Sequence, residues 1–147
     1  MLYNVQPQRD AVMKAIVQDK YGSADVLEAR EIEKPQIGET EVLVRVRAAS
    51  IHVGDWILMS GTPYVMRMAT GLRKPKNQVP GTDIAGAVEA VGKDVHGLRP
   101  GDEVFGWCTG AFAEYARIPA AAVEQGNVIP LAAHLSTAVA ALAEPLA

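Results

Sequence analysis

The side chains best suited to acid–base chemistry stand close together in the segment AASIHVGDW, residues 48–56. An imidazole can gain or lose a proton near neutral pH, so His52 could donate to a substrate oxygen. Asp55 follows three residues later and could orient the imidazole or a water molecule. We predict His52 and Asp55 as a pair that supplies and directs a proton. The structural alternatives are that His52 caps a turn and that Asp55 is the N-cap of a short helix.

A second segment, VPGTDIAGAVEAVG at residues 79–92, raises the question of a phosphate-binding loop. Its glycines, Gly81, Gly86 and Gly92, are five and six residues apart, whereas the dinucleotide-binding fingerprint G-x-G-x-x-G has closer spacings and opens a helix. Here an alternating strand pattern follows instead. We therefore predict that these glycines serve turns and bulges of a sheet. No other stretch of the 147 residues matches the fingerprint.

The elements that would position these side chains are short alternating strands, cut by turn residues about every ten positions. In EVLVRVRAAS, residues 41–50, the valines fall on one face and the arginines on the other. This pattern favours a mainly β fold, either a barrel or a sandwich. The predicted strands are 13–18, 27–33, 41–50, 85–92, the part of 99–106 after its Pro-Gly-Asp turn, and 111–118.

Two helices and an insertion interrupt the strands. Residues 54–61 form one short helix candidate, and residues 135–147 form another with Ser136 as its N-cap. Residues 63–80 are polar and basic, and we expect a loop or a partly helical flap there. Its basic part, Arg67 to Lys76, is either solvated or reaches a cofactor phosphate.

The composition is that of one ordinary globular domain. The formal net charge is −3 and no basic stripe occurs, which argues against a nucleic-acid partner. The single cysteine, Cys108, excludes an internal disulfide. No apolar run approaches the about 20 residues of a membrane span, and the start lacks a secretory signal pattern. We predict a cytoplasmic protein without a membrane partner, with residues 1–12 as a flexible extension.

Four stretches, taken in order, carry a family resemblance: GETEVLVRVRAASIHVGDWILMSG, VPGTDIAGAVEAVG, LRPGDEVFGW and GAFAEYARIPA. They are similar to the catalytic, GroES-like domain of medium-chain dehydrogenases/reductases, and most of all to the zinc-free, quinone oxidoreductase-like branch. The resemblance implies a GroES-like β-barrel over residues 13–134. It also implies a separate Rossmann domain that binds NADP or NAD, toward which residues 135–147 would begin a hinge helix.

The resemblance further implies hydride transfer to a quinone, an enone or another small carbonyl compound, in a protein that is a homodimer at full length. Such a reaction needs a donor for the developing oxyanion, and His52, oriented by Asp55, is the predicted one. The substrate cleft would be lined by Trp56, Tyr64 and Thr82, although a tryptophan at such a place is more often part of a core. The 147 residues by themselves are expected to be inactive, because they lack the dinucleotide fingerprint.

Zinc is not expected. Zinc-dependent relatives place a cysteine where this chain has His52, and a His-Glu pair where it has Thr82 and Asp83. A threonine hydroxyl is a poor zinc ligand, and the four-cysteine structural lobe of those relatives is also missing. The alternative is a site built from His52, Asp83 and Glu144, as in a zinc-dependent alcohol or polyol dehydrogenase. A further alternative is a non-catalytic GroES-like module for binding or oligomerisation.

Overall fold

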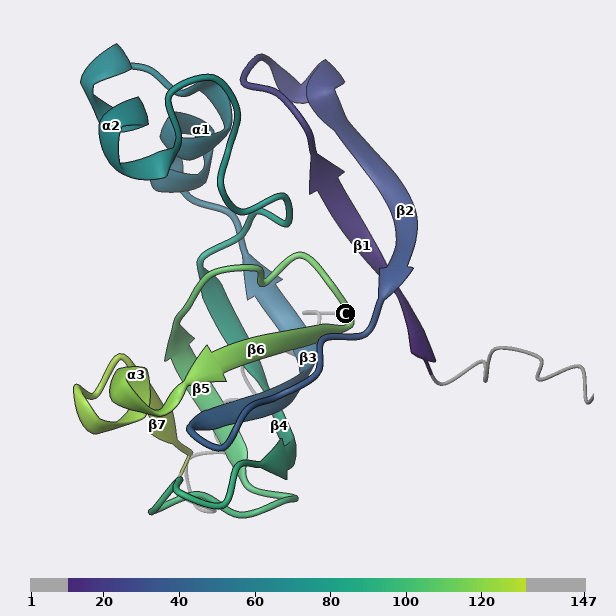
Figure 1. Cartoon of the computed structure of the whole chain (residues 1–147), viewed down its shortest axis with the longest axis vertical. Helices are drawn as coiled ribbons and strands as arrows, with labels where there is room; N and C mark the ends of the chain where they lie inside the picture. Colours follow the sequence, from purple (N-terminus) through teal and green to yellow (C-terminus); the bar gives the residue numbers. More distant parts are fainter. Residues whose placement is uncertain (1–10, 132–147) are drawn as a thin grey trace, which may run out of the picture.

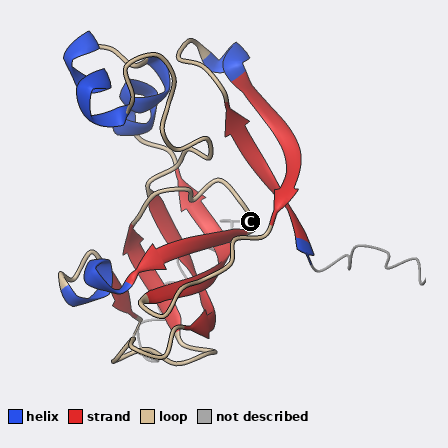
Figure 2. Ribbon diagram, viewed as in Figure 1, coloured by secondary structure: helices blue, strands red, loops and turns tan. Residues whose placement is uncertain are grey.

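The computed structural model describes residues 11–131, and strands make up most of its regular structure (Figures 1 and 2). A five-stranded antiparallel sheet has the order β6-β3-β4-β5-β7, and β1 and β2 form a separate antiparallel pair. The strands are β1 Val12–Gln18, β2 Leu27–Glu33, β3 Glu41–Ser50, β4 Asp83–Val91, β5 Glu103–Trp107, β6 Tyr115–Pro119 and β7 Val128–Pro130. The helices are α1 Val53–Ser60, α2 Arg67–Thr70 and α3 Ala120–Glu124, with 3-10 turns at Ala24–Val26 and Tyr64–Met66.

The core lies on the inner face of the five-stranded sheet. Val42 and Val44 of β3 are fully buried, while Arg45 and Arg47, which follow them on the opposite face, are exposed, as the alternation predicted. Leu43 is buried as well, so both faces of the sheet are covered at this end of β3. The other large side chains that are fully buried come from β5, β6 and β7: Val104, Ile118 and Val128.

The pair β1–β2 is tied to the sheet through the chain that leads into β6. The Ile16 N–H donates to the Phe112 carbonyl at 2.8 Å, and Ala15 forms an isolated bridge with Ala113. The strand predicted at residues 111–118 therefore begins only at Tyr115. Residues before Tyr115 look like a continuing strand in sequence, but Phe112 and Glu114 hydrogen-bond to β1. Of these two residues, Glu114 also accepts from the Val46 N–H of β3.

The mainly helical excursion between β3 and β4, residues 53–80, is called the helical lobe below (Figure 1). Its helix α1 is one residue displaced from the predicted 54–61 and ends at Gly61, whose φ of 63° is the left-handed C-cap conformation. The expected flap at residues 63–80 is partly helical. Tyr21 fastens it to the β1–β2 connection, because the phenol O–H donates to the Gly71 carbonyl at 2.7 Å.

The glycines of residues 79–92 have backbone roles, as predicted. A Cβ on Gly86 would collide with the Arg45 carbonyl of the neighbouring strand, and one on Gly92 would collide with the Glu39 carbonyl. Gly81 has a φ of 95°, which favours glycine. Strand β4, not a helix, follows Gly81, so this segment has no phosphate-binding geometry.

Two predicted segments lie wholly or mainly outside the described residues: the hinge helix at 135–147 and all but two residues of the extension at 1–12. Within residues 11–131, no helix has the length and apolar character needed to cross a bilayer.

Candidate functional site

The candidate site lies where three strands of the sheet end together. The register places Ser50 of β3 beside Asp83 of β4, and Asp83 beside Trp107 of β5. The chain then turns from Ser50 into α1, which brings α1 over the segment that leads into β4. His52 and Asp55 reach this place from one side and Thr82 from the other. The pairing of β3 with β4 therefore assembles side chains that are 30 positions apart in sequence.

His52 is the N-cap of α1, which corrects the alternative interpretation of Asp55 as the cap. The ring Nδ1 of His52 accepts from the Gly54 N–H at 2.8 Å. Asp55, in the first turn of the helix, returns the interaction by accepting from the His52 N–H at 2.9 Å. The two residues thus form a reciprocal cap, or capping box, at the start of α1. Their spacing of three residues in the sequence is the spacing that such a cap requires.

Thr82 joins these two residues into one hydrogen-bonded network. Its hydroxyl donates to the second oxygen of Asp55 at 3.1 Å and lies 2.8 Å from Nε2 of His52. Because Nδ1 already accepts from a backbone N–H, the proton of the neutral ring is on Nε2 and is donated to Thr82. The result is a directional chain from His52 to Thr82 to Asp55, called the His52–Thr82–Asp55 network below.

The members of this network differ in access to solvent. Asp55 is 6 % and Thr82 is 2 % exposed, whereas the His52 side chain is 40 % exposed. Of the three side chains, only the imidazole has an exposed edge that a substrate can reach. Both oxygens of Asp55 are engaged inside the protein, and the Thr82 hydroxyl both accepts and donates there. This arrangement suits His52 for contact with a substrate oxygen, and it suits the other two for holding the ring.

Trp56 and Tyr64 are not brought into the network. Trp56 follows Asp55 on α1 and is 57 % exposed, so it has not become part of the core. Tyr64 lies further along the helical lobe, where its ring packs against the guanidinium of Arg67 at 4.6 Å. Their predicted contact with substrate remains a prediction.

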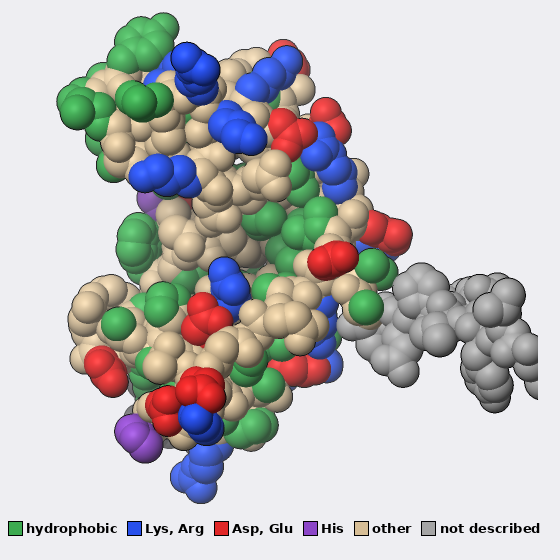
Figure 3. All heavy atoms as spheres, viewed as in Figure 1, with side chains coloured by type: hydrophobic (Ala, Val, Ile, Leu, Met, Phe, Trp, Pro, Cys, Tyr) green, Lys and Arg blue, Asp and Glu red, His purple; other side chains and the backbone are tan. Residues whose placement is uncertain are grey.

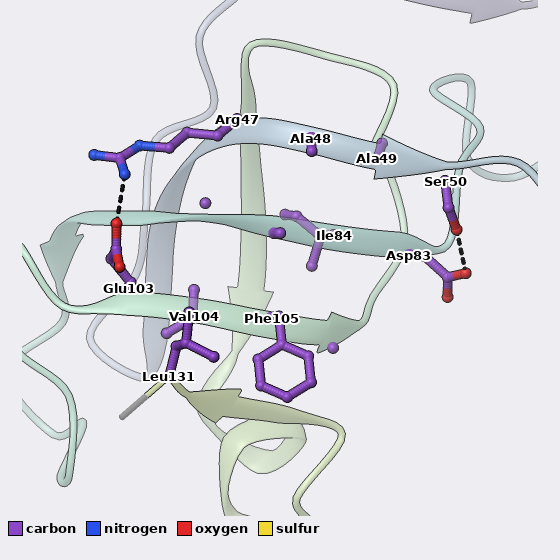
Figure 4. Close-up of a pocket in the computed structure, with 13 residues that line it drawn as sticks. Arg47, Ala48, Ala49, Ser50, Asp83, Ile84, Glu103, Val104, Phe105 and Leu131 are labelled. Carbon is purple, nitrogen blue, oxygen red and sulfur yellow. Dashed lines mark hydrogen bonds and ion pairs between the residues drawn. The ribbon is translucent and has the colours of Figure 1, made fainter. Parts of the chain in front are cut away.

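Sequence reasoning missed one contributor to the site. Ser50, the last residue of β3, donates a hydrogen bond of 2.6 Å to the Asp83 carboxylate (Figure 4). That carboxylate is in turn 3.8 Å from Nε2 of His52, so Ser50 holds an acidic group beside the exposed edge of the ring. No local pattern marks Ser50, because only the β3–β4 register places it next to Asp83.

Two cavities border the site. One of about 240 Å³ lies beside α1 and α2 of the helical lobe, with Asp55 and Thr82 in its wall. The other, of about 760 Å³, runs across the sheet face and is mainly apolar, with Phe105 and Leu131 along it (Figure 4). The Ser50–Asp83 pair stands at one end of this sheet-face groove, and an ion pair between Arg47 and Glu103 stands near the other.

The side chains at the positions where zinc-dependent relatives bind zinc do not suit a zinc ion. Thr82 offers only a hydroxyl, and both ring nitrogens of His52 are engaged in hydrogen bonds. Within residues 11–131, no three His, Cys, Asp or Glu side chains are grouped as metal ligands would be. Glu144, the third member of the alternative site, lies outside the described residues. A zinc-free site remains our prediction.

Cys108 is expected to be an unreactive thiol. Its side chain is 6 % exposed, and burial together with the nearby Asp83 carboxylate raises its pKa from 9.0 to about 11. At pH 8 its thiolate fraction should therefore be about a hundredfold lower than that of an ordinary cysteine. A chromogenic disulfide reagent should modify the native protein slowly and the denatured protein at once. Equally rapid reaction in both states would contradict this burial.

Comparison with known proteins decides the family. Residues 38–129 match the family described as the alcohol dehydrogenase GroES-like domain. The chain belongs to this family. Within the medium-chain dehydrogenases/reductases, its similarity is to the quinone oxidoreductase-like branch. The four sequence motifs and the mainly β fold are thus confirmed as those of a GroES-like domain.

Three relatives illustrate the similarity. The quinone oxidoreductase of Lama guanicoe is 36 % identical over 109 residues, which is 71 % of this chain and 31 % of that protein. The 2-methylene-furan-3-one reductase of Solanum lycopersicum is 38 % identical over 95 residues, or 64 % of this chain and 23 % of that protein. The structure of Escherichia coli quinone oxidoreductase complexed with NADPH has a TM-score of 0.65 at 25 % identity, covering 82 % of this chain and 34 % of that one.

The chain spans about a third or less of the length of these relatives. The GroES-like domain described above therefore corresponds to one part of each longer protein.

Proposed function

We propose that this GroES-like domain forms the substrate side of an NADPH-dependent reductase that acts on a quinone, an enone or another small carbonyl compound. The observation that carries the proposal is the His52–Thr82–Asp55 network, which presents a single half-exposed imidazole at the ends of β3 and β4. The quinone and enone reductases among the relatives support the substrate class.

The residues of the network would act as follows. The substrate oxygen takes the place of Thr82 as the acceptor of the Nε2 proton of His52. Asp55 keeps the ring in position through the helix cap while Nε2 changes partner. Hydrogen bonding from Nε2 then stabilises the negative charge that develops on the oxygen during reduction. The Asp83 carboxylate, held by Ser50, lies 3.8 Å from Nε2 at the exposed edge of the ring.

The nicotinamide cofactor would supply the hydride, and the residues described here do not form its binding site. Dinucleotides are bound at a glycine-rich turn that opens a helix, and the glycines of residues 79–92 lead into β4 instead. The expected division of labour is that this domain binds and orients the carbonyl compound, while a nucleotide-binding domain holds NADPH against it.

The 147-residue chain alone should not oxidise NADPH in the presence of 1,2-naphthoquinone or an α,β-unsaturated ketone. The reason is the missing dinucleotide site, without which the hydride donor is not held near the carbonyl. Absorbance of NADPH at 340 nm measures the reaction. Saturable NADPH oxidation by this chain would overturn the division of labour proposed above.

In a protein that joins this domain to its nucleotide-binding domain, His52→Ala should lower kcat by about a hundredfold. His52→Asn, which keeps a hydrogen-bond donor and a helix cap, should retain most of the rate. KM should change little, because the lost hydrogen bond strengthens only as charge develops. Equal rates for His52→Ala and wild type, with the fold intact, would remove His52 from the proposed reaction.

A further inference from the structure

The outer end of the helical lobe exposes a cluster of large apolar side chains. Figure 3 shows apolar atoms gathered at the tip of this lobe, beside Lys and Arg side chains. Four side chains are between 66 and 74 % exposed: Tyr64, Val65, Met68 and Leu72. Burial of such groups lowers the free energy, so an exposed cluster of this kind indicates a binding surface.

The same surface is positively charged although the chain as a whole is acidic. No Asp or Glu occurs from Trp56 to Thr82, while the complete sequence has 17 such residues and a net charge of −3. Arg73, Lys74 and Lys76 have no ion pair among the described residues. Asp19, whose carboxylate also feels the charge of Lys74, is paired with Arg30.

Arg67 has a different task within the lobe. Its guanidinium lies 4.4 Å from the ring centroid of Tyr21 and 4.6 Å from that of Tyr64, and its Nε donates to the Gly61 carbonyl. It braces the turn that carries the apolar cluster. The lobe therefore presents its apolar side chains from a supported turn, with the three unpaired cations immediately after it.

An apolar cluster beside unpaired cations favours one kind of binding partner. A second copy docked through the same surface would bring like charges together, since a twofold interface pairs a patch with itself. Exposed apolar side chains flanked by lysine and arginine are what proteins insert into the headgroup region of anionic bilayers.

We propose that residues 64–76 of the helical lobe dock on an anionic membrane surface. Met68 and Leu72, with Tyr64 and Val65, would enter the headgroup region, and the three cations would contact lipid phosphates. The net negative charge of the rest of the chain would turn the remaining surface away from the bilayer. This surface contact goes beyond the proposed reductase activity, and it differs from the sequence expectations of no membrane partner and of Tyr64 at the substrate cleft.

The test is co-sedimentation of the 147-residue chain with vesicles. Vesicles of phosphatidylcholine alone are compared with vesicles that contain about one third phosphatidylglycerol. We expect at least about tenfold stronger binding to the anionic vesicles, falling as salt is added. No binding to the anionic vesicles, or equal binding to both kinds, would overturn the proposal.

Two pairs of variants separate the contributions. Met68→Ser with Leu72→Ser should abolish binding, whereas Val12→Ser, an exposed apolar position on β1, should leave it unchanged. Arg73→Glu with Lys74→Glu should weaken binding about tenfold or more. Lys14→Glu with Arg99→Glu, an equal change of net charge outside the lobe, should have a much smaller effect.

Circular dichroism confirms that each variant is folded before binding is compared. Binding that survives the two serine substitutions but not the charge reversal would instead identify a simple anion site, such as one for a nucleotide phosphate. Competition by free NADPH would then confirm that result, and the membrane proposal would be wrong.

Discussion

Replacing Asp55 by alanine should lower the free energy of unfolding by about 2–4 kcal/mol. The carboxylate accepts hydrogen bonds from the His52 N–H and from the Thr82 hydroxyl, and it is almost completely buried. Alanine would remove one half of the helix cap and leave a buried hydroxyl without its acceptor. Urea denaturation followed by circular dichroism measures the change.

The conservative and control variants make this result specific. Asp55→Asn keeps one oxygen as an acceptor and should cost about half as much. Asp94→Ala, at an exposed loop position, should change stability by less than about 0.5 kcal/mol. If Asp55→Ala were as stable as Asp94→Ala, the network would not be formed in solution. In a protein with its nucleotide-binding domain, Asp55→Asn should lower kcat, because the imidazole loses part of its support.

Replacing Gly86 by alanine should be strongly destabilising, at a cost of about 2–3 kcal/mol. Gly86 lies in β4 opposite Val46 of β3, and a Cβ there would strike the Arg45 carbonyl. A backbone carbonyl cannot move aside as a flexible side chain can, so the two strands would have to separate. This separation would disturb the β3–β4 register that brings His52 to Thr82.

Gly38→Ala is the matched control, because its new Cβ would meet only the end of the Glu41 side chain, at 3.3 Å. It should change stability by less than about 1 kcal/mol. Thermal unfolding of both variants compares them directly. Similar melting temperatures for Gly86→Ala and Gly38→Ala would show that β3 and β4 are not as close as described.

The predictions for Asp55 and Gly86 both concern the His52–Thr82–Asp55 network. Asp55 stabilises the network from α1, while Gly86 permits the close strand pairing that places Thr82 within its reach. Loss of either should therefore affect both stability and the orientation of His52. A double variant whose cost differs from the sum of the single costs would measure that coupling.

Local patterns predicted those parts of the fold that depend on local interactions. The alternation of residues 27–33 and 41–50 was sufficient to identify β2 and β3 with their observed bounds. The strand at residues 111–118 was predicted too long, since the segment before Tyr115 hydrogen-bonds to β1. Alternation records which residues are apolar, but it does not record which strand accepts the hydrogen bonds.

The sequence likewise predicted those residues of the candidate site that are close together in the chain, but not those that only the fold brings together. His52 and Asp55 were recognisable because their chemistry and their spacing are both local. The alternative that made Asp55 the N-cap was wrong, and it arose because an imidazole is a less common cap than a carboxylate. Ser50 could not be found at all, because its partner Asp83 is 33 positions away.

The sequence by itself determined the family, the β character and the two polar residues at the end of β3, because motifs and periodicity are properties of neighbouring positions. Only the tertiary structure decided what those residues do to one another. The antiparallel pairing of β3 with β4 brings Thr82 between the imidazole and the carboxylate, and it sets which side chain is exposed. The tertiary structure also shows that the helical lobe presents an apolar and basic surface, since the exposure of a side chain depends on how distant segments pack.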